Sequence, residues 1–332
     1  MNPTLLCLIL LLAACNSKPG TQKVRIANIG TGLQTLHMPL ALAQTLGFFR
    51  EEGLDVTLEN LSSNAKTLQA LIGGSVDVAG IHQMQTIQMA AEGQHIRTFF
   101  VMMERSSTVL LVAPNATEKI RSAEDLRGAV IGVPSPGAPT HVNINYFLQK
   151  HGIQPSEIKP VAIGVAAAAV AAIESGRLDA AAVSNGDHFR LLRRNPPLRI
   201  LLDTSTTEGM RHAYGTSVLP NGVVAAKQEW LDQNPDTARR ISRAVARANQ
   251  WITSHTPQEI RDKLPEGLRS PDVAADLEIL QWSLPSFTKG GAMTPGGPEA
   301  LKKMLDTTSE TIRNSKIDLA ATWTNDYLPN SK

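Results

Sequence analysis

Short apolar segments alternate with helical segments over residues 24–202, and the alternation runs through twice. Strands that alternate with helices in this way predict an α/β fold in which helices cover both faces of a parallel sheet. The pattern begins again near Ser122, and 332 residues suffice for two lobes with separate cores. The expected strands are 24–29, 54–58 and 76–79 in the first pass and 129–133, 161–165, 180–183 and 198–202 in the second.

A ten-residue echo supports two related halves. Residues 70–79 read ALIGGSVDVA and residues 172–181 read AIESGRLDAA, with Ala, Gly, Asp and two branched apolar residues at shared offsets. Each segment predicts the end of a helix, a glycine in the left-handed conformation and a strand of small residues. The echo is short, so chance similarity stays open as an explanation.

From Trp230 onward the predicted strands stop and helices take over. Asn234 and Pro235 are typical of a helix start, with a capping residue before a proline at the first helical position. One face of that helix carries Ile241, Val245, Ala248 and Ile252 at helical spacing. Further helical segments are expected at about 257–264, 272–286 and 298–314. We expect these helices to return onto the first lobe.

The apolar stretch at residues 99–112 is long enough for one strand, a turn and another strand. The predicted layout therefore places residues 24–113 and 215–332 in a first lobe and residues 114–214 in a second. The chain crosses twice between the lobes in this layout. Hinges are expected near residues 113–115 and 215–220.

The beginning of the chain is typical of an exported protein. Residues 4–14 form an apolar run, which is shorter than the about 20 residues of a membrane-spanning helix but has the length of a signal-peptide core. The run ends in LAAC at Cys15, which resembles the bacterial lipobox and implies cleavage before Cys15 and lipidation of its thiol. We expect a signal peptide at 1–14 and a lipidated tether at 15–23. The alternative is an ordinary signal peptide that contains a cysteine, and no Lys or Arg precedes the run.

Cysteine and charge usage narrow the function further. Cys7 lies within the apolar run, and Cys15 is the only other cysteine, so the folded body carries no disulfide. An exported chain of this length with large cores needs none. The net charge is +2 and no basic stripe with interleaved aromatic residues is present, so nucleic acid is excluded as an expected partner.

Residues 47–56, which read GFFREEGLDV, resemble a signature of the periplasmic solute-binding proteins of ABC transporters, of the nitrate, sulfonate and bicarbonate type. That class also includes binders of taurine and of a thiamine-precursor pyrimidine. Residues 70–79 and 125–133 fit the same pattern in order and spacing, and the resemblance covers about 24–325. It implies a two-lobed α/β structure, the periplasmic binding protein type II fold, with a ligand cleft between the lobes.

The resemblance also implies a role. The protein is expected to be the lipid-anchored, extracytoplasmic component of an ABC importer, in the periplasm or at the cell surface. It would bind a small-molecule ligand as a monomer, dock on the transporter permease, and need no cofactor or metal. A small organic anion such as a sulfonate is the first expectation for the ligand, and a neutral heterocycle such as a pyrimidine precursor is the second.

Two other functions stay open beside this role. One is a ligand-sensing lipoprotein that signals to a membrane kinase. The other is an enzyme on the same scaffold, since one related group makes a pyrimidine from its own histidine and uses a cysteine-rich iron motif. This chain has no cysteine cluster, so we expect no enzyme.

Ligands of an open parallel sheet bind beyond the carboxyl ends of the strands, where loops enter helices. The loops expected there are rich in Gly, Ser, Thr, Asn, Gln and His and contain no Arg or Lys. An anion would therefore be held mainly by the N-terminal ends of helices, with His37, His82 or His141 as charged helpers. The predicted ligand-binding residues are Thr31, Gly32, Leu33, Gln34, His37, Asn64, His82, Gln83, Ser135, Gly137, Ala138, Thr140, Gly164, Ser184, Asn185 and Tyr214.

Several of these candidates have a purely structural alternative. Gly30 and Gly32 could begin a dinucleotide-binding fingerprint, but Thr35 stands where the third glycine belongs. A helix cap or a packed side chain is the alternative for residues 62–64, His37, residues 184–187 and Tyr214. Convergence of these loops on one cleft would favour ligand binding.

Overall fold

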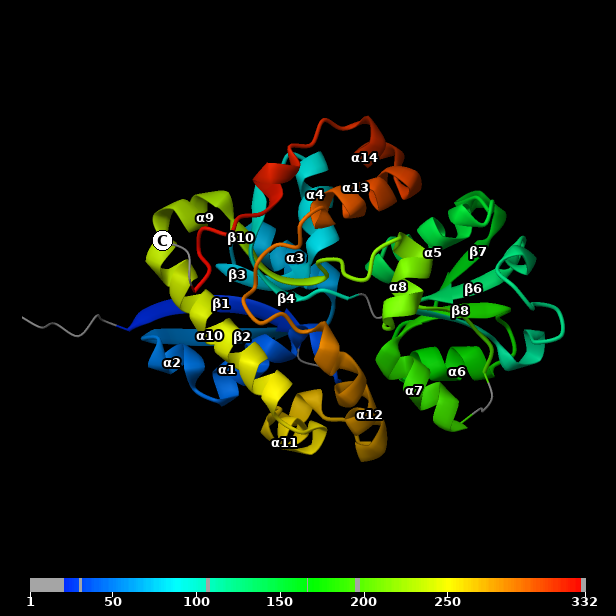
Figure 1. The fold of residues 1–332 in the computed structure, drawn as a ribbon, viewed down its shortest axis with the longest axis horizontal. Helices are drawn as coiled ribbons and strands as arrows, with labels where there is room; N and C mark the ends of the chain where they lie inside the picture. Colours follow the sequence, from blue (N-terminus) through cyan, green and yellow to red (C-terminus); the bar gives the residue numbers. More distant parts are fainter. Residues whose placement is uncertain (1–20, 30–31, 106–107, 166, 195–197, 330–332) are drawn as a thin grey trace, which may run out of the picture.

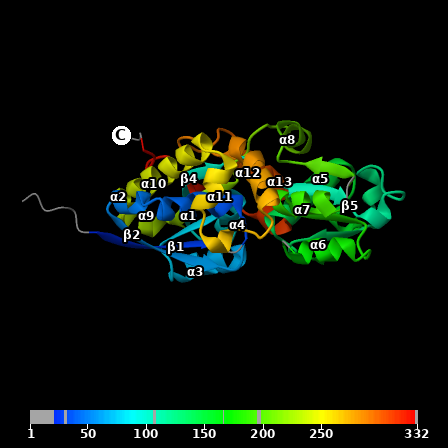
Figure 2. The ribbon, with the colours of Figure 1, turned by 90° about the horizontal axis from the view of Figure 1, so that it is seen from below.

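The computed structural model describes residues 21–29, 32–105, 108–165, 167–194 and 198–329. These residues form two α/β lobes, each built on a five-stranded sheet flanked by helices (Figure 1). The lobes follow one another along the long axis of the molecule, as the view from below also shows (Figure 2). The predicted two-lobed α/β fold is confirmed.

The sheet of the first lobe has the strand order β2-β1-β3-β10-β4. Its strands are β1 (Gln22–Ile29), β2 (Leu54–Leu61), β3 (Val78–His82), β4 (Ile96–Met103) and β10 (Gly222–Lys227). The first part of the chain adds the helices α1 (Met38–Thr45), α2 (Phe48–Glu51), α3 (Asn64–Gly73) and α4 (Gln83–Ala91). The inner strand β3 is almost wholly buried, whereas the edge strand β2 alternates between buried and exposed residues. Covered inner strands therefore read as continuous apolar runs in the sequence.

The sheet of the second lobe has the order β7-β6-β8-β5-β9. Its strands are β5 (Thr108–Val112), β6 (Val130–Val133), β7 (Lys159–Ala162), β8 (Ala180–Ser184) and β9 (Ile200–Asp203). Its helices are α5 (Pro139–Lys150), α6 (Ala167–Glu174), α7 (Asn185–Arg194) and α8 (Thr207–Tyr214). The central strand β8 consists mostly of buried alanines, and the edge strand β7 is exposed along its length.

Each sheet is parallel, as expected, apart from one antiparallel strand that was not predicted. In the first lobe β10 runs antiparallel to β3 and β4, and in the second β5 runs antiparallel to β8 and β9. Strands β10 and β5 are each the first strand after a crossing between the lobes. A strand that enters a lobe from the hinge starts at the cleft edge, and it must run opposite to strands that end there.

The first crossing lies earlier in the chain than the predicted hinge at 113–115. Strand β4 belongs to the first sheet and β5 already belongs to the second, so the chain crosses between Met103 and Thr108. The apolar stretch at 99–112 does hold two strands, but they lie in different lobes. Residues 108–113 therefore move from the predicted first lobe to the second. The chain returns between α8 and β10, after Gly215 and before Gly222.

The helical return covers the first lobe and also contacts the second. Its helices are α9 (Gln228–Gln233), α10 (Pro235–Ser254), α11 (Pro257–Lys263), α12 (Val273–Ser283), α13 (Gly297–Thr308) and α14 (Glu310–Asn314). The four predicted apolar positions of α10 are fully buried against the first lobe. Helix α12 contacts α7 and helix α13 contacts α5, so the return bridges the two lobes. A return onto the first lobe alone was the expectation.

The predicted signal peptide and Cys15 lie outside the described residues. Within the described part of the chain, none of the helices is both long enough and apolar enough to cross a membrane.

Candidate functional site

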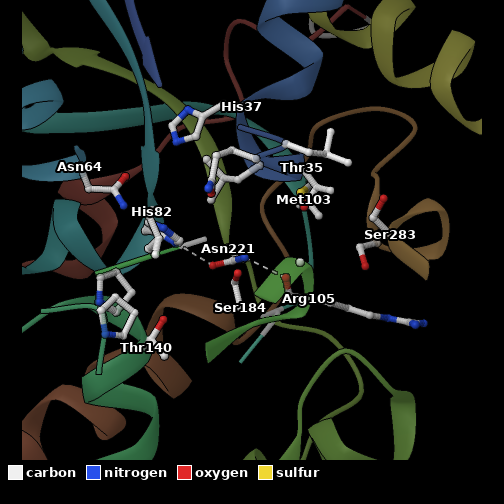
Figure 3. Close-up of a pocket in the computed structure, with 18 of the residues that line it drawn as sticks. Thr35, His37, Asn64, His82, Met103, Arg105, Thr140, Ser184, Asn221 and Ser283 are labelled. Carbon is white, nitrogen blue, oxygen red and sulfur yellow. Dashed lines mark hydrogen bonds between the residues drawn. The ribbon is translucent and has the colours of Figure 1, made fainter. Parts of the chain in front are cut away.

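A cavity of about 130 Å³ lies between the lobes, and loops of both lobes line it. On the first lobe most lining residues lie at the carboxyl ends of β1, β2, β3 and β4, and the rest come from the segment before β10 and from α12 and the turn after it. On the second lobe they lie at the carboxyl ends of β6, β7 and β8. This is where parallel strands present a ligand site. Figure 3 shows His37, Asn64, Thr140 and Ser184 around this pocket, although they come from distant parts of the chain.

Half of the predicted binding residues line this cavity. They are Leu33, Gln34, His37, Asn64, His82, Ala138, Thr140 and Ser184. The alternative of a helix cap proves correct for Ser63, whose hydroxyl accepts a hydrogen bond from the Lys66 amide at 3.3 Å. The adjacent Asn64 is the residue of that segment that reaches the cavity.

Other predicted residues lie away from this cavity. The Gln83 side chain is buried inside the first lobe, where it donates to Thr86 Oγ1 at 2.9 Å and accepts from Thr98 Oγ1 at 2.5 Å. Tyr214 lines a separate narrow cavity and packs against Tyr146, with 6.1 Å between ring centroids. Both side chains therefore serve internal contacts of the fold.

The remaining predictions fall on turns or on undescribed residues. Gly137 and Gly164 lie outside the lining and adopt positive φ, which explains why glycine stands in these turns. Gly32 and Ser135 are also outside the lining of this cavity. Thr31 and the side chain of Asn185 lie outside the part of the chain that the structure describes.

His37 is held at the inner end of the cavity by a buried asparagine. Its Nδ1 lies 2.9 Å from Asn28 Oδ1, and Asn28 Nδ2 donates to the His37 carbonyl at 3.4 Å. Asn28 is fully buried and His37 is 2% exposed. The Asn64 side chain is next to this ring, and its Oδ1 is buried with no hydrogen-bond partner among the described residues.

His82 is held by a second asparagine in the same manner. Its Nδ1 lies 2.9 Å from Asn221 Oδ1, and Asn221 Nδ2 donates to the Arg105 carbonyl at 2.8 Å. The backbone of Asn221 is fixed as well, since its N–H donates to the Met103 carbonyl and its carbonyl accepts from the Gln83 N–H, each at 2.8 Å. Figure 3 shows the dashed bonds that join this group.

The histidines of the cleft are neutral near pH 7. Burial lowers the pKa of His37 to about 3, with the nearby His82 adding to the shift and Asn64 opposing it. Burial also lowers the pKa of His82 and of His141. Desolvation disfavours the protonated ring, so the structure without a ligand favours neutral histidines over the charged helpers that were expected.

Arg105 lines the cavity and was not among the predicted residues. It lies on the first crossing between the lobes and is the only positively charged residue among the described residues that line the cavity. Its Nε is buried without a hydrogen-bond partner in the described part of the chain. Figure 3 shows the side chain extending away from His37 and Asn64. The sequence signal that could have located Arg105 is the run of polar residues directly after the apolar strand β4.

The second lobe brings hydroxyl groups to the cavity. Thr140 lies in the first turn of α5, and Ser184 ends β8 just before α7. The Ser184 hydroxyl lies 3.1 Å from Asp187 Oδ2 and donates to this carboxylate, so its oxygen remains as an acceptor. Ser283 and Ser286, at the end of α12 and just after it, were not predicted.

The sequence also matches a known protein family. The family described as NMT1/THI5 like matches residues 34–260 of the chain, which is more than half of it. The chain belongs to this family. Within this NMT1/THI5-like protein, His37, His82 and Asn221 lie inside the matched range, whereas Ser283 lies beyond it.

Individual relatives share the fold over most of their length. A solved structure from Bordetella bronchiseptica RB50 has 31% sequence identity and a TM-score of 0.82, covering 92% of this chain and 95% of its own. The binding protein YtlA of Bacillus subtilis (strain 168) is 25% identical over 87% of this chain and 82% of its own. The alkanesulfonate-binding protein SsuA of Xanthomonas axonopodis pv. citri, bound to MOPS, has a TM-score of 0.69 at 18% identity, covering 92% of this chain and 99% of its own. The periplasmic binding protein fold is thereby confirmed.

Proposed function

We propose that this protein is the extracytoplasmic solute-binding component of an ABC importer. It captures a small organic anion between its lobes and presents the closed form to a permease. One observation carries the proposal: loops of both lobes line a small cavity at their strand ends, and a cation whose Nε has no partner among the described residues lies at its edge. Binding there would couple ligand capture to lobe closure.

The chemistry of Arg105 supports an anionic group on the ligand. A guanidinium offers several N–H donors in a fixed plane, which match the oxygens of a sulfonate or carboxylate. The helices α5 and α7 begin beside the cavity, and their partial positive charge adds to this preference. SsuA, which shares the fold, binds alkanesulfonates by its name.

The proposed location is a bacterial membrane surface, reached by export and a lipid on Cys15. The LAAC sequence supports this anchor. Mass spectrometry of the mature N-terminal peptide would test it. An unmodified Cys15 in membrane-extracted protein would contradict it.

The alternatives are weaker on these observations. An enzyme of the cysteine-and-iron type would need a cysteine cluster, which the sequence lacks, and an iron assay on purified protein would detect it. A sensor lipoprotein would bind the same ligand and differ only in its partner. Neighbouring genes would separate a permease partner from a membrane kinase.

The first prediction concerns Arg105. Replacing it by alanine should weaken binding of a sulfonate about 10- to 100-fold, since hydrogen bonds to charged groups contribute roughly 1.5–3 kcal/mol. Isothermal titration calorimetry with taurine, ethanesulfonate, nitrate and bicarbonate measures this. Arg121→Ala is the matched control, because Arg121 is exposed on the second lobe and does not line the cavity. Binding of none of these anions, or equal binding by both variants, would contradict the proposal.

A further inference from the structure

The two cleft histidines have defined tautomers, because each is bonded to an asparagine of fixed orientation. The Asn28 amide must point Nδ2 at the His37 carbonyl, and the Asn221 amide must point Nδ2 at the Arg105 carbonyl, since a carbonyl can only accept. Each Oδ1 then faces a histidine Nδ1 at 2.9 Å. An amide oxygen accepts only, so both rings carry their proton on Nδ1.

The same bonds determine what the rings offer to a ligand. In a neutral imidazole with its proton on Nδ1, Nε2 is a hydrogen-bond acceptor. Asn64 lies beside the His37 ring, within reach of a weak side-chain interaction, and its Oδ1, which makes no hydrogen bond of good geometry among the described residues, is another acceptor at this end. Across the cleft, the Ser184 hydroxyl donates to Asp187 and leaves its oxygen as an acceptor. The first-lobe wall of the cavity therefore gathers acceptors, and Ser184 adds an acceptor on the second lobe, close to Asn221 and Arg105 (Figure 3).

A buried acceptor is normally paired with a donor, and N–H groups of a bound ligand would supply donors to these acceptors. The described residues that line the cavity include no Asp or Glu, so an amino group of the ligand would be bound by these neutral acceptors. The one cation, Arg105, extends away from His37 and Asn64 (Figure 3). The end with the acceptors thus favours N–H donors on a solute, whereas the end with Arg105 favours an anionic group on the same solute.

We infer that the inner wall formed by His37, His82 and Asn64 selects a solute with N–H donors at the end opposite its anionic group, and that Asn28 and Asn221 are the positioning residues of this wall. This inference rests on the proposed function and names its ligand class as an amino-substituted small anion. Nitrate, bicarbonate and unsubstituted sulfonates would bring only oxygen lone pairs to the acceptors at this end. A site built to hydrogen-bond one group discriminates strongly against an analogue that lacks it.

The tautomers can be tested without any ligand. The protein is labelled with [15N]histidine, and two-bond 1H–15N correlation spectra at pH 7 distinguish a proton on Nδ1 from one on Nε2. His37→Gln and His82→Gln variants assign the two signals. Both rings should be neutral with the proton on Nδ1. A proton on Nε2, or a doubly protonated ring, would overturn the inference.

Ligand selectivity provides the second test. Calorimetry compares two matched pairs: taurine with ethanesulfonate, and 4-aminobenzoate with benzoate. In at least one pair the amino compound should bind at least about tenfold more tightly than its partner, the range expected when a buried partner is left unpaired. Equal affinities in both pairs would overturn the inference and leave the proposed function standing. Binding of no member of either pair would overturn both.

Asn221→Asp separates a positioning role from a merely structural one. A carboxylate beside Nδ1 favours a protonated His82, whose Nε2–H then donates. The preference for the amino compound should shrink or reverse, and ethanesulfonate should gain affinity. Asn115→Asp is the control, because Asn115 is exposed on the second lobe, where its Nδ2 donates to the Gly176 carbonyl. An unchanged affinity ratio in folded Asn221→Asp protein would contradict the role of Asn221.

Discussion

The two walls of the cleft are built in different ways. On the first lobe, His37 and His82 are each fixed by an asparagine side chain, and the Asn28–His37 pair is almost completely buried. On the second lobe, the cavity is lined by short residues at helix starts, such as Thr140 and Ser184. A wall of fixed rings sets which groups a ligand must carry, whereas a wall of small hydroxyl groups can close over many shapes.

The packing behind each wall matches this difference. The first lobe has the long helix α10 across its sheet, and its core holds the fully buried Phe49, Phe99 and Phe100. The second lobe has a central strand of alanines and one fully buried phenylalanine, Phe147. Ligand recognition should therefore depend on the rigidity of the first lobe, while closure depends on contacts of the second.

The largest expected effect is the pH dependence of the first lobe. His37 has a pKa of about 3 when folded, against 6.5 ordinarily, so the unfolded chain takes up a proton at a pH where the folded protein does not. Falling pH therefore favours the unfolded state through this window. The contribution of His37 to stability should fall by about 2 kcal/mol between pH 6.5 and pH 5. Urea unfolding at pH 7, 6 and 5 measures the slope.

The controls for this prediction separate His37 from other groups. His37→Gln should reduce the slope between pH 6.5 and 5, whatever its effect on absolute stability, and leave the part due to His82, His141 and His188, whose pKa values burial also lowers. The change His95→Gln, at an exposed histidine, should leave the slope as it is. A wild-type slope that persists in His37→Gln would show that the buried ring is not the source.

A matched pair of glycines sharpens the comparison between the walls. A Cβ on Gly80 in β3 would lie 2.8 Å from Leu40 Cδ1 and 3.3 Å from His37 Nδ1, and one on Gly132 in β6 would meet only aliphatic side chains, at 2.9 Å. Both changes to alanine should cost about 1–3 kcal/mol of stability through overpacking. Only Gly80→Ala should also weaken ligand binding, because it displaces His37. Calorimetry and thermal unfolding of both variants check this, and equal affinity losses would contradict the division of roles.

Much of the fold could be predicted because periodicity and turn chemistry are local. The strand expected at residues 24–29 lies within β1 (Gln22–Ile29), and the one expected at 180–183 lies within β8 (Ala180–Ser184). The sequence could not show which sheet a strand joins, and β5 was therefore placed in the wrong lobe. Pairing of β5 with β8 is a contact across about seventy residues, and local pattern carries no information about it.

Site residues that follow strand ends could be predicted from the sequence, whereas those on the segments that cross between the lobes could not. The residues after β1, β2, β3, β6 and β8 were found because the edge of a parallel sheet locates them. Arg105 and Asn221 lie on the segments that cross between lobes, and their place in the cavity follows only from the lobe arrangement. The neutral state of His37 follows from its burial. The sequence of one loop does not show whether a residue is buried.

The smallest expected effect concerns the contact that joins the lobes at the edge of the cleft. Arg193 of α7 reaches across to α12, with its Nη1 3.3 Å from Glu278 Oε1 and its Nε 3.8 Å from Asp272 Oδ2. All three side chains are more than 40% exposed, so such pairs contribute about 0.2–1 kcal/mol. Arg193→Ala should therefore favour the open form slightly and weaken ligand affinity no more than about fivefold.

The neighbouring Arg194 offers the matched control, because it pairs with Glu174 at 2.9 Å within the second lobe. Small-angle scattering should show a larger radius for ligand-free Arg193→Ala than for Arg194→Ala. Added salt should bring the affinity of the wild type toward that of Arg193→Ala, since exposed ion pairs are screened. If both variants keep the wild-type radius and affinity at low salt, the ion pair does not hold the lobes, and closure depends on the apolar contacts between α5 and α13 and on the ligand.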